Sequence, residues 1–214
     1  MGQSLTDDEE YRATTFVLID FETTTPKGYR PEPVEVAVVT LRDRGDGLAE
    51  VSRFCELIRP PAHAPITPLD TAKNGLRPDD VVDARLAPRV LADLDGLLAS
   101  PPYLLVAHNA HIEAGLLYDY REHCPRLAAT HLIDTIKLAR TVLPGLSSYS
   151  LDHLMAYLGI PRPARRHRAL PDVEVTARLF TRLITDGCWS CLRELTKISG
   201  LVPRATQPHQ DALF

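Results

Sequence analysis

The sequence predicts an α/β fold in which a mixed sheet, an antiparallel meander joined to parallel strands, is flanked by helices. Three observations support this prediction. Residues 14–20 form a continuous β-branched and aromatic run, which is typical of a central strand covered on both faces. Residues 34–41 and 51–58 are strand-like and are joined by a turn-rich link at 42–47, so they are expected to pair as an antiparallel hairpin. From residue 103 onward, strand-like and helix-like segments alternate, as in β-α-β units.

The segments after the meander are expected to follow as loop, helix, strand and helices. Residues 60–85 contain five prolines, so this stretch is predicted to be a loop with one helical turn near 67–74. Periodicity predicts an amphipathic helix at 86–99, strands at 103–107 and 131–134, and helices from 109, at 135–142, at 151–158 and at 169–185. The last helix has an apolar stripe formed by Val173, Ala177, Phe180 and Ile184.

The chain is expected to be one domain between two tails. Its 214 residues are enough for one domain with a sizeable core. Residues 13–198 contain the predicted elements, whereas residues 1–12 are predicted to be a polar N-terminal tail. Residues 199–214 are too polar and too rich in turn-forming residues to build a core, and they are predicted to be a flexible C-terminal tail.

Composition and charge narrow the functional classes. With 24 Lys+Arg against 28 Asp+Glu, the net charge is −4, which argues against a passive basic coat on nucleic acid. The acidic start and the lack of an apolar run of about 18 residues predict a cytoplasmic protein. The four cysteines are scattered, so Cys188 and Cys191 are interpreted as reduced thiols on one helical turn rather than as zinc ligands.

Two carboxylates lie at the end of the predicted central strand. Asp20 and Glu22 are two residues apart, so the period of a strand puts both on one face and Phe21 on the other. Two acids so placed repel each other unless a positive charge lies between them. The alternative interpretation is an exposed strand end with no task.

Two further segments carry acids with a possible chemical role. His167 precedes Asp172 by five residues, on the loop that leads into a predicted helix. Asp172 alone is equally well explained as a first-turn acid favoured by the helix dipole. Glu113 lies four residues before Leu117, so it borders the apolar face of its helix. A half-buried acid needs a cation or a hydrogen-bond donor.

Together, the three segments resemble the DEDD exonuclease superfamily, in the branch whose last element is a histidine. The resemblance covers residues 14 to about 187 and rests on Asp20-Phe-Glu-Thr-Thr24, His108-Asn-Ala110 and His167-x-Ala-x-x-Asp172. It implies a ribonuclease H-like fold and 3′→5′ exonuclease activity that releases nucleoside 5′-monophosphates. The chain departs from the usual family pattern in carrying Glu113 in place of Asp, and Thr25 in place of Gly.

The resemblance also implies roles for individual residues. Asp20 would bridge two divalent cations, Mg²⁺ or Mn²⁺; Glu22 and Asp172 would hold the first of them. Glu113 would act on the second, directly or through water, and His167 would be the general base. Cations about 3.5–4 Å apart suit an in-line displacement at phosphorus, and carboxylates are their preferred ligands.

Several residues near these motifs are predicted to contact the substrate. Arg162 and three other arginines surround His167 despite the acidic total, and this loop is predicted to contact phosphates of the scissile strand; the alternative is a solvated basic loop. His108 and Asn109 either contact the substrate or satisfy backbone groups. The predicted substrate-binding residues are Phe21, Thr23, Thr24, His108, Asn109, Arg165, Arg166 and Arg168.

The last five residues resemble a peptide that docks on the bacterial DNA sliding clamp. In Gln210-Asp-Ala-Leu-Phe214, Gln210, Leu213 and Phe214 match the Gln-x-x-Leu-Phe pattern, and a free end on a flexible tether suits docking. The alternative is an unstructured end without a function. This peptide is the reason for favouring DNA over RNA. The other functional hypotheses are an exoribonuclease that trims RNA 3′ ends, and a catalytically weak nucleic-acid-binding member of the fold.

Overall fold

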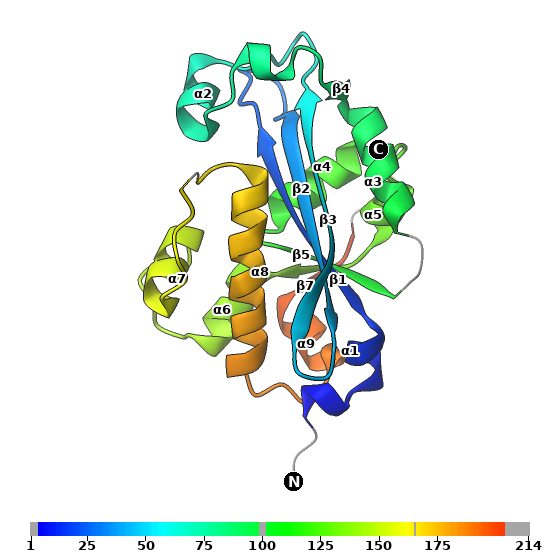
Figure 1. Cartoon of the computed structure of the whole chain (residues 1–214), viewed down its shortest axis with the longest axis vertical. Coiled ribbons are helices and arrows are strands. Elements are labelled where there is room, and N and C mark those ends of the chain that lie inside the picture. The colour runs from blue at the N-terminus through cyan, green and yellow to red at the C-terminus, as the bar shows by residue number, and fades with distance from the viewer. Residues whose placement is uncertain (1–3, 99–101, 165, 204–214) are drawn as a thin grey trace, which may run out of the picture.

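A mixed sheet forms the centre of the molecule. The computed structural model describes residues 4–98, 102–164 and 166–203, and within them the sheet has seven strands in the order β4-β3-β2-β1-β5-β6-β7 (Figure 1). The pairs β1–β2, β2–β3 and β6–β7 are antiparallel, whereas β1–β5, β5–β6 and β3–β4 are parallel. The predicted mixed sheet with its central first strand is therefore confirmed. The strands are β1 (Thr15–Thr23), β2 (Pro33–Asp43), β3 (Leu48–Arg59), β4 (Arg85–Leu86), β5 (Tyr103–Ala107), β6 (Leu132–Asp134) and β7 (Gly200–Leu201).

Helices cover both faces of this sheet (Figure 1). None of them, in the part of the chain that the structure describes, is long and apolar enough to cross a membrane. The α-helices are α1 (Glu9–Ala13), α2 (Pro68–Asn74), α3 (Ala87–Leu97), α4 (His111–Asp119), α5 (Pro125–Ala129), α6 (Thr135–Val142), α7 (Leu151–Leu158), α8 (Ala169–Asp186) and α9 (Leu192–Ser199). Two short 3₁₀ helices are η1 (Leu5–Asp7) and η2 (Pro78–Val81).

The alternation of side chains along β1 divides the core into two clusters. Phe16 and Leu18 point to the face covered by α6, α7, α8 and α9. Val17 and Ile19 point to the opposite face, which α3, α4 and α5 cover. Successive strand residues face opposite sides of a sheet, so Asp20 and Glu22 continue the row of Phe16 and Leu18 on the α8 face.

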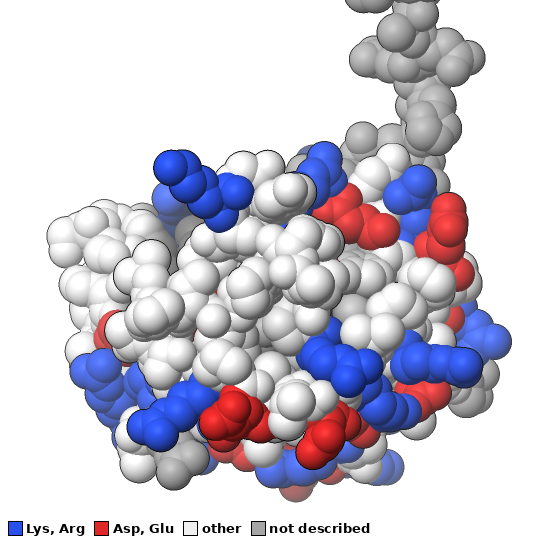
Figure 2. Space-filling model, turned by 90° about the horizontal axis from the view of Figure 1, so that it is seen from above, with Lys and Arg blue, Asp and Glu red and all other residues white. Residues whose placement is uncertain are grey.

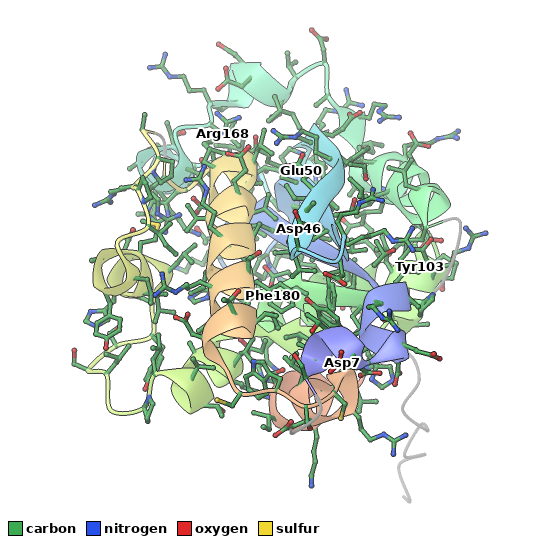
Figure 3. All side chains as sticks on the ribbon, turned by 60° about the horizontal axis from the view of Figure 1, so that its bottom comes forward. Asp7, Asp46, Glu50, Tyr103, Arg168 and Phe180 are labelled. Carbon is green, nitrogen blue, oxygen red and sulfur yellow. The ribbon has the colours of Figure 1, made fainter. Side chains whose placement is uncertain are left out.

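The longest helix, α8, fixes one side of the site. Its predicted stripe is confirmed, because Val173, Ala177 and Phe180 are buried and Ile184 packs against the same cluster. Figure 3 shows Phe180 along this helix and Arg168 at its beginning. The N-terminus of α8, the end of β1 and α2 all lie at the same end of the molecule (Figure 1).

The N-terminal segment differs from the predicted polar tail. Residues 5–13 form η1 and α1, and Leu5 and Tyr11 are 5% and 2% exposed in the α8-side cluster. Tyr11 contacts Phe16 with ring centroids 5.5 Å apart, and Phe16 contacts Phe180 at 5.2 Å. Two isolated apolar residues in a charged segment carry no periodicity, so the sequence pattern did not reveal this packing.

The C-terminal boundary also differs from the prediction. Gly200–Leu201 pairs with β6 as the edge strand β7, and α9 before it was not predicted. The carboxylate of Asp8 links the two ends of the domain. It accepts hydrogen bonds from Glu10 N in α1 and from Leu192 N at the start of α9. Such a contact between segments distant in sequence leaves no local pattern. The short helix α5 was not predicted either.

A stability measurement tests whether the N-terminal segment belongs to the folded domain. Tyr11→Ala is expected to lower the free energy of unfolding by about 3 kcal/mol, because it empties a fully buried aromatic site. Urea denaturation followed by circular dichroism measures this change. Tyr157→Ala is the control, since Tyr157 is 58% exposed, and it should change the free energy by less than about 0.5 kcal/mol. Equal effects of the two substitutions would contradict the packing described above.

Candidate active site

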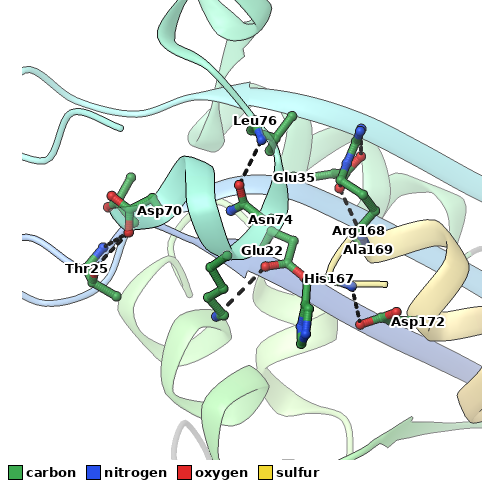
Figure 4. Close-up of polar contacts among 12 residues, drawn as sticks. Glu22, Thr25, Glu35, Asp70, Asn74, Leu76, His167, Arg168, Ala169 and Asp172 are labelled. Atoms are coloured by element: carbon green, nitrogen blue, oxygen red, sulfur yellow. Dashed lines mark hydrogen bonds and ion pairs between the residues drawn. The ribbon is translucent and has the colours of Figure 1, made fainter. Parts of the chain in front are cut away.

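Three carboxylates meet where β1 ends beside the first turn of α8. Asp20 and Glu22 come from β1, and Asp172 comes from α8. One oxygen of each lies within 4.8 Å of the others. Asp20 is partly exposed, whereas Glu22 and Asp172 are 4% and 6% exposed. Figure 4 shows Glu22 and Asp172 on the strand and the helix that carry them. The structure thus brings together three of the five residues predicted from the motifs.

Burial and mutual repulsion make this cluster hard to ionise. Burial raises the pKa of Asp20 well above its ordinary value, and the charges of Glu113, Glu22 and Asp172 raise it further. Burial also raises the pKa of Glu22 to about 7, against the lowering effect of Lys73. A nearby positive charge favours the ionised form of such groups. The cluster is therefore suited to binding cations.

Glu113 lies at the border of the cluster rather than within it. It occupies the first turn of α4, is 3% exposed, and its Oε2 has no hydrogen-bond partner among the described residues. Burial raises its pKa to about 8. Its charge is the largest neighbouring influence that raises the pKa of Asp20. Glu113 therefore interacts electrostatically with Asp20, although its oxygens do not belong to the cluster of Asp20, Glu22 and Asp172.

The donor set fits a hard divalent cation. All candidate ligands are carboxylate oxygens, which Mg²⁺ and Mn²⁺ prefer over the nitrogen and sulfur ligands of softer metals. The protein supplies positive charge at the rim, because Lys73 Nζ lies 3.9 Å from Glu22 Oε2 and Arg166 forms an ion pair with Asp172. Asp20, Glu22 and Asp172 would hold a cation, with Glu113 next to them.

His167 lies directly beside Asp172. Its backbone is in the left-handed region, with φ of +60°, which is uncommon for a residue with a Cβ atom. Its N–H donates to Asp172 Oδ2 at 3.3 Å (Figure 4). The loop before α8 therefore brings the predicted general base next to a predicted metal ligand.

The arginines around His167 are bound to acids of the protein itself. Arg166 is 8% exposed in its side chain, and its Nε donates to Asp152 Oδ1 at 2.9 Å. Arg168 binds Glu35 with two hydrogen bonds, from Nε at 2.9 Å and from Nη2 at 2.6 Å. This loop is therefore not simply a solvated basic loop, because Arg166 and Arg168 form ion pairs with acids of the protein.

Of the other two arginines of this loop, the structure describes only Arg162. Arg162 is 67% exposed in its side chain and lies 3.9 Å from Asp152, so it is more open to a ligand than Arg166 and Arg168, the other arginines of this loop that the structure describes. Arg165 lies outside the described residues. Contact of these side chains with substrate phosphates stays a prediction.

Phe21 requires a correction, since it was predicted to bind substrate. It is 7% exposed and packs in the cluster on the opposite face of the sheet. The alternation that brings Asp20 and Glu22 to the site turns Phe21 away from it. Thr24 is also turned into the protein, because it is fully buried and its N–H donates to Glu32 O at 2.9 Å.

The segment after β5 also turns largely inward. His108 Nδ1 lies 2.9 Å from Thr135 Oγ1, and burial lowers the pKa of His108 to about 4. Asn109 has a φ of +66°, and its N–H donates to Asp134 Oδ1 at 3.3 Å. For His108, which also has a hydrogen bond to the backbone of Tyr149, this geometry favours the interpretation that it satisfies backbone groups. Asn109 is exposed, and only its backbone N–H is bonded here. Their contact with substrate, like that of Thr23, stays a prediction.

Thr25 has a structural partner that the sequence did not suggest. Both its N–H and its hydroxyl donate to Asp70 Oδ1, at 3.0 and 2.6 Å (Figure 4). Burial opposes ionisation of Asp70, but hydrogen bonds from Thr25 and Thr67 lower its pKa. Asp70 lies in the first turn of α2, so Thr25 ties this helix to the end of β1.

Three residues of the site were not identified from the sequence. Lys73 and Asn74 form the last turn of α2, and the Asn74 amide lowers the pKa of Glu22. Glu35 on β2 is 2% exposed and holds Arg168. An acid within the apolar run from Val34 to Leu41 was the visible indication of Glu35, whereas nothing local distinguished Lys73.

A hollow adjoins the carboxylates on the α2 side. It has a volume of about 680 Å³ and its lining includes Lys73, Asn74, Arg77, Arg166 and Arg168. Seen from the end where α2 lies, the surface as a whole carries both signs of charge around a broad uncharged area (Figure 2). The lining of the hollow thus carries more positive than negative side chains, with Asp80 as its acid, while the face seen in Figure 2 carries both signs of charge.

Comparison with known proteins places this geometry among nucleases. A model of an exonuclease family, RNase T, matches residues 17–180. A PolC-type DNA polymerase III of Thermotoga maritima is 32% identical over 183 residues, which are 85% of this chain and 13% of that protein. The 3′-5′ exonuclease DinG of Bacillus subtilis is 30% identical over 176 residues, which are 79% of this chain and 17% of DinG. The chain thus spans less than a fifth of the length of these relatives.

Solved structures share the arrangement. Exonuclease X in complex with 5′ overhanging duplex DNA is 27% identical with a TM-score of 0.64, covering 86% of this chain and 98% of the other. The nuclease domain of 3′hExo, a DEDDh family member bound to rAMP, has a TM-score of 0.73 over 85% of this chain and 96% of the other. At 23% identity, the second likeness concerns the fold alone.

The raised pKa of Glu113 predicts a pH-dependent effect on stability. Without cations, the contribution of Glu113 to stability is fully present below pH 4.5, its ordinary pKa. This contribution is lost as the pH rises through about 8, its pKa in the folded protein. Glu113→Gln removes this loss while Asp20, Glu22 and Asp134 remain. In chelator, the variant is therefore expected to melt at the wild-type temperature near pH 5 and several degrees higher near pH 9, at about 2–4 °C per kcal/mol.

Differential scanning fluorimetry at several pH values measures this difference. Glu122→Gln, on the exposed surface, is the control and should melt like the wild type throughout. A Glu113→Gln advantage that does not grow with pH would show that Glu113 ionises without penalty.

Proposed function

The chain belongs to the exonuclease family, and we propose that it is a metal-dependent 3′→5′ exonuclease that releases nucleoside 5′-monophosphates. Membership confirms the resemblance inferred from the three motifs, and the sheet order and flanking helices are those of the ribonuclease H-like fold. One observation supports the proposed activity above all. Asp20, Glu22 and Asp172 converge within 4.8 Å, and His167 is bonded through its backbone to the last of them.

The proposed reaction is the hydrolysis of the last phosphodiester bond. A water oxygen forms the new bond to phosphorus, the bond from phosphorus to the 3′ oxygen of the preceding nucleotide breaks, and that oxygen takes up a proton. His167 accepts the proton of the attacking water.

Two Mg²⁺ or Mn²⁺ ions, when bound, supply the positive charge that stabilises the attacking and leaving oxygens of an in-line displacement. Asp20 is proposed as the shared ligand, because its pKa is raised by the charges of the three other carboxylates. Glu22 and Asp172 would hold the first cation, and Glu113 would serve the second directly or through water. Lys73, with its ammonium group at the rim, is proposed to face a substrate phosphate.

DNA is the proposed substrate, with RNA as the alternative. The curated relatives quoted above are a DNA polymerase and an exonuclease, and Exonuclease X is described with duplex DNA. A different neighbour is described as a 3′-exonuclease that recognises a histone mRNA stem-loop, which keeps the exoribonuclease hypothesis open. The face seen in Figure 2 carries both signs of charge, which is unfavourable for binding along the phosphates of a duplex. It is better suited to binding the 3′ end of a strand.

A nuclease assay tests this proposal directly. Purified protein is incubated with 5′-labelled single-stranded DNA or RNA, with Mg²⁺, Mn²⁺ or chelator, and the products are separated by gel electrophoresis. Wild-type protein is expected to shorten DNA from its 3′ end only with a cation. Asp20→Asn is expected to lower kcat at least about 10³-fold, because it removes a ligand that both cations share. Glu113→Asp, which keeps the carboxylate, is expected to retain activity.

The same assay separates the alternatives. Shortening of RNA alone would support the exoribonuclease. Binding without shortening would support the catalytically weak member of the fold. Near-normal rates for Asp20→Asn would contradict the metal assignment.

We also propose that Gln210, Leu213 and Phe214 dock on a bacterial DNA sliding clamp. These residues lie outside the described part of the chain, so the support is the sequence pattern and the likeness to a replicative polymerase. Docking of the end of the chain leaves the nuclease site free to act on a DNA end held nearby.

Deletion of residues 210–214 is expected to abolish clamp association and to leave activity on free oligonucleotides unchanged. Surface plasmon resonance with immobilised clamp measures the first effect, and the gel assay measures the second. Asp211→Ala changes a position that the pattern leaves open, so this control should still bind. Association that survives the deletion would remove the hypothesis.

A further inference from the structure

A buried acid on β2 holds the loop that carries His167. Glu35 lies between Val34 and Val36 in the middle of the sheet and is 2% exposed. An unpaired carboxylate at such a place is strongly destabilising. Glu35 instead accepts three hydrogen bonds, two from the guanidinium of Arg168 and one from the N–H of Ala169, at 2.9, 2.6 and 2.9 Å (Figure 4). The beginning of α8 is thereby fixed to the sheet.

His167 immediately precedes these two anchored residues. On its other side, Arg166 is bound to Asp152 and Asp172. The left-handed backbone of His167 is unfavourable by about 1–3 kcal/mol, and such a conformation persists only where neighbouring contacts enforce it. The ion pairs of Arg166 on one side and Arg168 on the other hold the backbone of His167 in this conformation. The position of the imidazole therefore depends on these ion pairs.

The anchor and a metal ligand share one rigid frame. Glu35 pairs directly with Glu22 of β1 and with Leu57 of β3, so it is held from both sides. Its negative charge raises the pKa of Glu22, and the bound Arg168 places a positive charge beside it. A two-bond contact between guanidinium and carboxylate fixes direction as well as distance, which a lysine cannot do.

We infer that Glu35 and Arg168 form a positioning pair that sets His167 relative to the carboxylates fixed on β1. This inference rests on the proposed function, in which His167 is the general base. Arg168 then acts through His167 and does not itself touch the reacting atoms. The contacts of Arg168 support this, since its guanidinium is bound to Glu35 on the sheet.

Arg168→Lys is the discriminating variant. It keeps the charge and leaves the bond from Ala169 N to Glu35 in place, so only the two-bond contact is lost. We expect kcat to fall about 10- to 100-fold, because a misplaced general base loses only part of the contribution of about 10²–10⁴ that it makes, while KM changes less than about 2-fold. Glu35→Gln, which keeps the shape but removes the charge, is expected to act in the same direction.

A double-mutant cycle with His167→Ala tests whether the effect passes through the histidine. In that background, Arg168→Lys should change kcat by less than about 2-fold, because the group it positions is gone. Arg53→Lys is the matched control, since Arg53 binds Glu50 with two hydrogen bonds and Glu174 of α8 with one. These contacts lie outside the loop that carries His167, so this substitution should leave kcat unchanged. Equal losses from Arg168→Lys in both backgrounds would overturn the inference.

A structural readout keeps the test independent of activity. The ring resonances of His167, identified by their disappearance in His167→Ala, should shift in Arg168→Lys and stay in place in Arg53→Lys. If His167→Ala itself keeps wild-type kcat, the assigned base is wrong, and these resonances alone decide whether the pair positions the ring. Unchanged resonances in both Arg168→Lys and Glu35→Gln would refute the positioning pair.

Discussion

The concentration of negative charge at the end of the central strand is the constraint on which the rest of the structure depends. Three carboxylates share a space of 4.8 Å and a fourth is buried beside them. Isolated charges in such a place are strongly unfavourable. The pKa values of Asp20 and Glu22 are raised for this reason, because burial and the neighbouring carboxylates disfavour their ionised forms. The surrounding elements can be understood as the means by which the fold tolerates the cluster and keeps it in place.

The fold divides this work between strands and loops. The strands supply fixed positions, because β1 is paired on both sides by β2 and β5. The segments around them supply the positive groups, with Lys73 from the last turn of α2 and Arg166 from the loop before α8. The carboxylates on the sheet thus keep their geometry, while the positive groups beside them come from the end of a helix and from a loop.

Local patterns predicted the main strands and helices and the candidate site residues, but not α1, α5 and α9 or the contacts that hold the site. The period of two placed Asp20 and Glu22 together, and the helical period predicted the buried stripe of α8. Glu35 and Arg168 are 133 residues apart, and no local period relates them. The burial of Tyr11 and the turning of His108 toward Thr135 likewise depend on neighbours that only the folded chain brings close. Tertiary pairing, not propensity, decided these positions.

The departure of Glu113 from the usual family pattern acquires a physical meaning in this setting. Its pKa of about 8 and that of about 7 for Glu22 imply that, near neutral pH and without cations, the cluster holds protons in place of metal charge. Under the proposed function, a cation that binds there would displace those protons, so its affinity would rise with pH over the range in which these two groups ionise. The Oε2 of Glu113 is buried and has no hydrogen-bond partner among the described residues, so burial outweighs the backbone hydrogen bond that lowers the pKa of this group. Under the proposed function, the residue that departs from the pattern would thereby couple occupancy of the site to pH.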